Sequence, residues 1–192
     1  MGPDSAFHRA LEKFSDVAVV AAIMVACCLV VVPGGRAIRS SYRVWLLDSP
    51  HPIRTFIRGL REPGGAVSWW WGFTLVIHIL ALIEWLAIDH FAVRSGILSG
   101  ILMVYAISAW YVPLASCAGT GVVETFRSSV GLSIRHPIRT CGVLITAIVV
   151  WVLILALIPH SLFFGFLIIG IGQYLAASFV TPLLGCNLLG GK

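Results

Sequence analysis

Long apolar stretches alternate with short polar segments along this chain, and arginine residues are concentrated in the polar segments. A helix needs about 20 apolar residues to cross a hydrocarbon core of about 30 Å. Five stretches approach this length, so we expect an all-α, multi-pass transmembrane helical bundle formed by a single domain of residues 1–192. The predicted spans are residues 17–33, 66–88, 95–116, 141–158 and 162–184. The basic segments between them, residues 34–65 and 117–140, are predicted to be cytoplasmic loops.

Helical spacing continues into the first of these loops. Between residues 52 and 61, one face of a helix would be apolar and the opposite face basic. The apolar face consists of Ile53, Phe56, Ile57 and Leu60, and the basic face of Arg54, Arg58 and Arg61. A less regular pattern at residues 38–46 predicts a second amphipathic helix. Both are expected to lie in the membrane interface and anchor the loop.

Composition supports a membrane protein and excludes a soluble globule. Hydrophobic residues make up 59% of the chain and charged residues 11%, against about 45–50% and about 25% in ordinary soluble domains. Thirteen lysines and arginines stand against eight aspartates and glutamates, which gives a net charge of +5. Ten of the thirteen cations lie in the two loops or at the C-terminus. The positive-inside rule then predicts a cytoplasmic C-terminus and, with five spans, an N-terminus outside.

The same distribution predicts the partners of the basic residues. Cations beside membrane spans set the orientation of a protein in the membrane and contact anionic lipids of the inner leaflet. We therefore expect no nucleic-acid binding. The arginines within or close to residues 51–61 and 135–140 are the candidate contacts for lipid or for a protein partner. They are Arg54, Arg58, Arg61, Arg135 and Arg139.

A short sequence repeat marks both loops. The pentapeptide HPIRT occurs at residues 51–55 and again at residues 136–140, and Arg-Ser-Ser precedes both copies, at residues 39–41 and 127–129. The similar offsets predict a duplicated helix–loop–helix unit, and both copies approach the membrane from the same side, which makes the repeat parallel. Proline in the first turn of a helix loses no hydrogen bond, so HPIRT suits a helix start.

Two polar residues interrupt the apolar stretches near their middle. His78 lies in the second predicted span and Gln173 in the fifth, so both are expected at the same depth. A polar side chain within a membrane is costly unless it is paired or faces water. We therefore interpret His78 and Gln173 as a candidate midplane pair, which forms an interhelical hydrogen bond or contacts a substrate or a transported proton.

A second set of polar residues is predicted near the outer membrane surface. Glu84, Asp89 and His90 lie toward the end of the second span, and Asp16 is expected at the same level on the first. Together they form a candidate acidic cluster that would bind a cation or sugar hydroxyls from outside. Hydration at the interface is the simpler explanation.

Aromatic residues mark the expected membrane surfaces, because tryptophan and tyrosine favour the membrane–water interface. The aromatic residues at the predicted inner surface are Trp69, Trp70, Trp71, Trp110 and Tyr111, and Trp85 lies at the outer one. We expect these side chains to form an aromatic belt.

The sequence offers no catalytic constellation. It has no glycine-rich phosphate loop, no HExxH motif and no GxSxG motif, and its five cysteines lack metal-ligand spacing. We therefore expect no enzymatic activity, no metal and no cofactor. Two pairs of small residues, Gly96 with Gly100 and Gly172 with Ala176, predict close helix packing within the chain.

Four features of the chain are similar to those of a known family. They are Val32-Pro33 after the first apolar stretch, the basic segment from Arg36 to Arg61 with Phe56, the sequence Tyr111-Val112-Pro113-Leu114, and the stretch from Ser129 to Arg139 with its Arg-His-Pro. With them the chain resembles the YesL-like integral membrane proteins of Gram-positive bacteria, a domain-of-unknown-function family, over almost its whole length. The resemblance implies a bacterial cell membrane and, because such proteins are often encoded beside carbohydrate ABC transporters, a supporting role in oligosaccharide uptake. It supplies no catalytic residues.

Two functions remain open from the sequence. The first is a non-enzymatic accessory protein that contacts an ABC permease or another membrane subunit through its basic loops. The alternative is a small transporter or channel, assembled as a homo-oligomer, with His78, Gln173 and Glu84 along its path.

Overall fold

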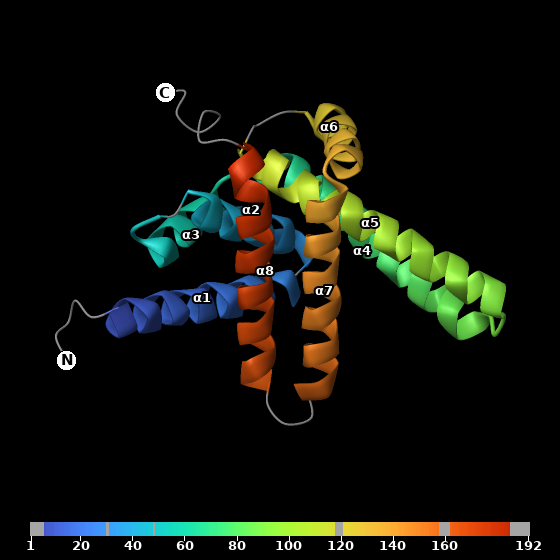
Figure 1. Ribbon diagram of the computed structural model, residues 1–192, viewed down its shortest axis with the longest axis horizontal. Helices are drawn as coiled ribbons and strands as arrows, with labels where there is room; N and C mark the ends of the chain where they lie inside the picture. Colours follow the sequence, from blue (N-terminus) through green and yellow to red (C-terminus); the bar gives the residue numbers. More distant parts are fainter. Residues whose placement is uncertain (1–5, 30, 48, 118–120, 158–161, 185–192) are drawn as a thin grey trace.

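The computed structural model describes residues 6–29, 31–47, 49–117, 121–157 and 162–184, and all regular structure in this part of the chain is helical (Figure 1). These residues form α1 (Ala6–Leu29), α2 (Val31–Leu46), α3 (Pro52–Arg61), α4 (Gly65–Ala87), α5 (Phe91–Cys117), α6 (Val122–Arg135), α7 (Pro137–Leu157) and α8 (Leu162–Leu184). The predicted all-α class is confirmed.

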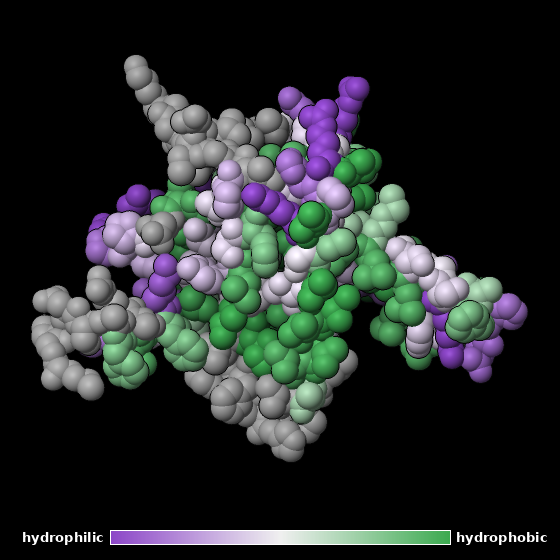
Figure 2. Space-filling model, viewed as in Figure 1, coloured by the Kyte–Doolittle hydropathy of each residue, from purple (hydrophilic) through white to green (hydrophobic). Residues whose placement is uncertain are grey.

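Three of the five predicted spans are helices that are long and apolar enough to cross a membrane. They are α4, α5 and residues Pro137–Ile154 of α7, whereas the apolar part of α8 that the structure describes, Ile168–Pro182, is shorter. Large apolar side chains such as Leu80, Met103 and Ile145 are exposed on these three helices, and hydrophobic surface lies along them in Figure 2. The three helices indicate that the chain resides in a membrane.

The first predicted span, residues 17–33, is not a single helix. α1 ends at Leu29, and α2 begins at Val31. α1 also begins ahead of the apolar stretch and includes the carboxylates of Glu12 and Asp16. Its apolar part is therefore shorter than the about 20 residues that a crossing needs, and five spans are not confirmed.

Two helical hairpins give the molecule its shape. α4 packs against α5, and α7 packs against α8. Figure 1 shows the two hairpins diverging from a common region that contains α2, α3 and α6, with one end of each hairpin helix in this region. We name this region, formed by α2, α3, α6 and the first turn of α7, the basic end, because it contains the arginines of the two predicted loops.

α2 lies at the centre of the fold, although the sequence predicted a loop with a surface helix here. It packs against α1, α3, α4, α5 and α8, and its Ala37, Ser40, Ser41 and Val44 are buried. Arg36 remains exposed. Leu46 is buried as well. The reason for the difference is that small residues on much of this buried face let several neighbouring helices approach α2 closely.

Glycines make the contact between α2 and α4 possible. A Cβ atom added at Gly34 would lie 2.6 Å from Nε1 of Trp71, and one added at Gly35 would lie 2.7 Å from Oγ of Ser68 and closer still to its Cα. Real Cβ atoms essentially never come within 3.0 Å of another heavy atom in this way. The observed spacing of α2 and α4 therefore requires glycine at both positions.

The two predicted pairs of small residues behave differently. Gly172 of α8 faces α7, where an added Cβ would overlap Cγ2 of Val150, and Ala176 is buried. Gly96 and Gly100 of α5, in contrast, have no described atom within 4 Å of an added Cβ. The prediction of packing within the chain is confirmed for Gly172 and wrong for Gly96 and Gly100.

Three residues of the predicted aromatic belt are buried in the core instead. Trp110 and Tyr111 of α5 are 0% exposed, and Trp70 of α4 stacks on Tyr111 with ring centres 4.5 Å apart. Trp70 donates a hydrogen bond to Oγ of Ser108, and Trp110 donates one to Oγ1 of Thr140, both at 2.9 Å. These partners make burial possible, because a buried indole N–H needs an acceptor.

Both copies of HPIRT begin a helix, as predicted. The backbone N–H of Thr55 donates to the carbonyl of His51 at 3.0 Å, and that of Thr140 donates to His136 at 3.1 Å. The first copy begins the short helix α3, whereas the second begins the much longer α7. A duplicated unit beyond these helix starts remains a prediction.

Replacing Gly35 with alanine is expected to lower the free energy of unfolding by about 1–3 kcal/mol, because overpacking forces α2 away from α4. The measurement is reversible denaturation of the purified protein in detergent, followed by tryptophan fluorescence. Gly100→Ala is the matched control. Its new methyl group meets open space and alanine favours a helix by about 1 kcal/mol over glycine, so stability should not fall. Equal losses for both variants would contradict the close packing of α2.

Replacing Thr140 with valine is expected to cost about 1–3 kcal/mol in the same denaturation experiment, because the buried indole N–H of Trp110 loses its acceptor. Thr55→Val, at the equivalent position of the other HPIRT copy, is the matched control. The hydroxyl of Thr55 contacts Oγ of Ser49 at 2.7 Å, and Thr55 is partly exposed. Its loss should therefore cost less. An equal loss in the free energy of unfolding for both variants would contradict a special role of the indole hydrogen bond.

Candidate functional site

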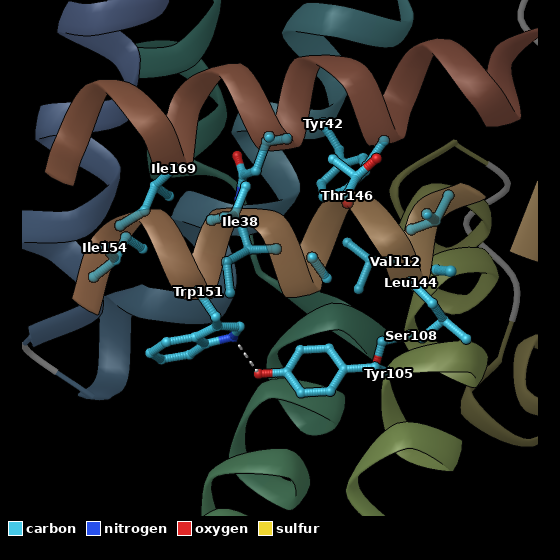
Figure 3. Close-up of a pocket in the computed structure, with 17 residues that line it drawn as sticks. Ile38, Tyr42, Tyr105, Ser108, Val112, Leu144, Thr146, Trp151, Ile154 and Ile169 are labelled. Atoms are coloured by element: carbon cyan, nitrogen blue, oxygen red, sulfur yellow. Dashed lines mark hydrogen bonds between the residues drawn. The ribbon is translucent and has the colours of Figure 1, made fainter. Parts of the chain in front are cut away.

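Two adjoining cavities lie between the diverging hairpins. The first, of about 340 Å³, is enclosed by α2, α5, α7 and α8, and Figure 3 shows its lining side chains. The second, of about 300 Å³, is enclosed by α2, α4 and α5, with one residue of α7. Both cavities share the side chains of Ile38, Tyr105, Ser108, Val112 and Trp151. We refer to the two cavities together as the hairpin pocket.

Tyr105 and Trp151 connect the two hairpins within this pocket. The indole Nε1–H of Trp151 on α7 donates to the hydroxyl oxygen of Tyr105 on α5 at 3.1 Å (Figure 3). The Trp151 side chain is also 51% exposed. The wall between the two cavities thus reaches the molecular surface, where it is built from two aromatic rings.

His78 lines the second cavity. Its Nδ1 lies 2.6 Å from the carbonyl oxygen of Thr74, one helical turn earlier in α4. A carbonyl only accepts hydrogen bonds, so this contact places a proton on Nδ1 and leaves the lone pair of neutral imidazole on Nε2. Nε2 is buried and has no described partner, and the ring meets that of Tyr105 edge to face with centres 5.6 Å apart.

Gln173 lines the first cavity and has a different partner. The hydroxyl of Ser41 on α2 donates to its Oε1 at 2.5 Å, which connects α8 to the centre of the fold. Tyr42 lines the same cavity, and burial raises the pKa of its hydroxyl to about 12, so it stays neutral. The structure thus places His78 and Gln173 in neighbouring cavities with separate hydrogen bonds and does not bring them together.

Most of the remaining lining is apolar. The hydroxyl of Ser108, one of the shared polar groups, already donates to the carbonyl of Val104 at 2.7 Å and accepts from Trp70. Thr146 is likewise occupied, because it donates to the carbonyl of Gly142 at 2.9 Å. In the second cavity, the free hydrogen-bonding capacity therefore lies around His78 and Tyr105, while in the first cavity no hydrogen bond is described for the hydroxyl of Tyr42 or for Nε2 of Gln173.

The predicted outer acidic cluster is divided between two places. Glu84, Asp89 and His90 are exposed at the connection between α4 and α5, and Asp89 forms an ion pair of 2.8 Å with Arg94. Asp16 lies elsewhere, on α1. The described residues include no group of three histidine, cysteine, aspartate or glutamate side chains that would hold a metal ion.

Asp16 faces the basic end. With Glu12 it lines an open cavity of about 510 Å³, whose other wall includes His51 and Arg54 at the start of α3. α1 and α3 also pack against one another directly. The first half of α1 is therefore on the same side of the molecule as the arginines, whereas the sequence predicted it on the opposite side.

The five candidate arginines belong to the basic end. Arg54, Arg58 and Arg61 are exposed on α3, and Arg135 is exposed at the end of α6. Arg139 is partly buried in the first turn of α7 and donates to the carbonyl of Phe179 at 3.3 Å. Hydrophilic surface lies over α3 and α6 in Figure 2. No ion pair joins any of the five to a carboxylate among the described residues.

Two arginines of α2, in contrast, share one carboxylate. Nη1 of Arg43 lies 2.5 Å from Oε2 of Glu62, and Nη1 of Arg39 lies 3.8 Å from the same atom. Glu62 follows directly after α3, so the pair connects this helix to α2. The unpaired positive charge of the basic end therefore resides mainly on α3 and α6.

The sequence analysis did not identify Tyr105 and Trp151. They are 46 residues apart on different helices, and no pattern along the chain connects them. One signal was present, because Trp151 lies well inside an apolar stretch, away from the ends where tryptophan is most often found.

No protein-family model, no curated protein and no solved structure matches this chain. The resemblance to the YesL-like proteins therefore stays a prediction.

Proposed function

We propose that this chain is a non-enzymatic, multi-pass membrane protein that acts by binding anionic lipid headgroups and a second membrane protein at its basic end. One observation supports this most. The exposed arginines of α3 and α6 lie on two helices that flank the region where the hairpin helices begin and end, without carboxylate partners among the described residues (Figure 1). Unpaired guanidinium groups beside apolar helices favour phosphate headgroups or an acidic protein surface.

The partner is a membrane subunit with an acidic cytoplasmic surface, and the YesL-like resemblance points to the permease of a carbohydrate ABC transporter. Arg54 and Arg135 are the best placed contacts, because both side chains are exposed. Arg139 is less available, since it already binds a carbonyl of α8.

The positions of the helix ends support a revised topology in the bacterial cell membrane. Four hairpin helices, each with one end at the basic end, give four crossings and a cytoplasmic end of α8. The first half of α1 lies beside α3, with Asp16 near Arg54, which supports a start of α1 on the same side as α3. This proposal differs from the N-terminus outside that the sequence predicted, because α1 folds back and does not add a fifth crossing.

The alternative function is a small oligomeric transporter that uses the hairpin pocket as part of its path. The polar residues His78 and Gln173 line its two cavities, but the Tyr105–Trp151 pair lies between them. Flux measurements on proteoliposomes distinguish the two functions, since a protein that acts by contact has no transport of its own.

Replacing Arg54 and Arg135 together with glutamine is expected to reduce recovery of a cross-linked partner from native membranes about tenfold or more, since each cation near an anionic surface contributes about 1 kcal/mol. The measurement is affinity purification after mild cross-linking, with quantitative mass spectrometry. Arg94→Gln, a charge loss at the connection between α4 and α5, is the control and should leave recovery unchanged. Unchanged recovery of the partner in the double variant would show that the basic end does not bind it and would contradict the proposal.

Single cysteines introduced for Phe7, Arg58 and His90 are expected to report the revised topology in a background whose native cysteines are replaced with alanine. A membrane-impermeant maleimide added to intact cells should label His90→Cys and leave Phe7→Cys and Arg58→Cys unlabelled until the cells are lysed. Labelling of Phe7→Cys in intact cells would support the predicted outside N-terminus instead. Labelling of Arg58→Cys in intact cells would overturn both topologies.

A further inference from the structure

We propose that the hairpin pocket binds a membrane amphiphile that consists of a hydrocarbon chain with a single hydroxyl group at its end. This inference goes beyond the proposed function and does not depend on a partner at the basic end. It rests on the size of the pocket, its apolar lining and two polar groups with unused hydrogen-bonding capacity.

The pocket has the size and character of a small-molecule site. Its two cavities of about 340 Å³ and about 300 Å³ each fall near the lower bound of about 300 Å³ for ligand sites. The lining includes apolar side chains from both hairpins, such as Val104, Val150 and Ile154. Water is a poor occupant of such a space, because a buried water molecule needs about three polar partners.

The polar groups of the pocket decide which hydrocarbon chain is held. Lipid tails are as apolar as the pocket, so moving a chain from the bilayer into it gains little hydrophobic free energy. Selection then depends on hydrogen bonds to the end of the chain. In the second cavity, the groups available for this are Nε2 of His78 and the hydroxyl of Tyr105.

These two groups are complementary to a hydroxyl. Nε2 of His78 offers a lone pair and has no described partner. The Tyr105 oxygen accepts the indole hydrogen of Trp151, so its own hydrogen is left to donate. A ligand hydroxyl matches both groups, since it can donate to an imidazole nitrogen and accept from a phenol, and the two rings lie next to each other with centres 5.6 Å apart. A carboxylate has no hydrogen to give to Nε2.

The depth of His78 excludes a phospholipid headgroup as its partner. It lies near the middle of α4, a helix long enough to cross the membrane. A charged phosphate headgroup at this depth is costly, whereas a hydroxyl with two hydrogen bonds is not. Long-chain or polyprenyl alcohols are therefore the chemical class that fits.

The test uses a photoreactive hexadecanol, with a diazirine in the middle of its chain and an alkyne at its tail, added to the full-length protein in phosphatidylglycerol nanodiscs. After irradiation, mass spectrometry should find cross-links on α5 and α7. Unlabelled hexadecanol should compete about tenfold better than hexadecane or hexadecanoic acid, which corresponds to about one net hydrogen bond. Equal competition by hexadecane, or better competition by the acid, would overturn the proposal.

Three variants locate the site. Ala147→Phe places a ring in the first cavity and should abolish the cross-links, whereas Ile148→Phe, on the exposed side of α7, should leave them unchanged. His78→Phe keeps a ring of similar size but loses Nε2, so hexadecanol should compete no better than hexadecane. Thermal unfolding in the same nanodiscs identifies folded variants. Undiminished cross-linking in folded Ala147→Phe, or a retained preference for hexadecanol in folded His78→Phe, would overturn the proposal.

Discussion

The close approach of α2 to α4, with Gly34 and Gly35 against Trp71 and Ser68, is the contact on which the arrangement depends. α2 also packs against α1, α3, α5 and α8, so its distance from α4 sets where five helices meet. The side chains of α2 at its closest contacts are small, whereas Ile38, Tyr42 and Leu46 fill the space beside them. A segment with three arginines can therefore occupy the centre of a membrane protein, because the arginines stay on the side that faces Glu62 or the surface.

Long apolar stretches predicted α4, α5 and α7 well, because hydropathy over about 20 residues is a local property of the sequence. The position of α2 was not predictable in this way. Glycine and serine give no strong hydropathy signal, and whether Ser40 is buried depends on which helices surround it. The same reason explains Trp110, which was expected at the interface. Its burial depends on an acceptor, Thr140, that lies 30 residues away in the sequence.

The sequence predicted individual residues of the candidate site, but it did not predict which residues contact one another. His78 and Gln173 stand out because polar groups in apolar helices are rare, and both line the hairpin pocket. Their partners, however, come from tertiary contacts that periodicity does not encode, such as Ser41 on α2. Asp16 was expected beside Glu84 on the assumption that α1 crosses the membrane. The packing of α1 against α3 overturns that expectation.

The central position of α2 has a consequence for biosynthesis. Four of the helices that pack against it, α3, α4, α5 and α8, leave the ribosome after it. With three arginines and few large apolar residues, α2 is a poor substrate for the translocon by itself. It must therefore wait, at the membrane surface, until the later hairpins are inserted. The segment translated second is among the last to reach its final place, so a stall or truncation before α8 leaves the early part of the chain unassembled.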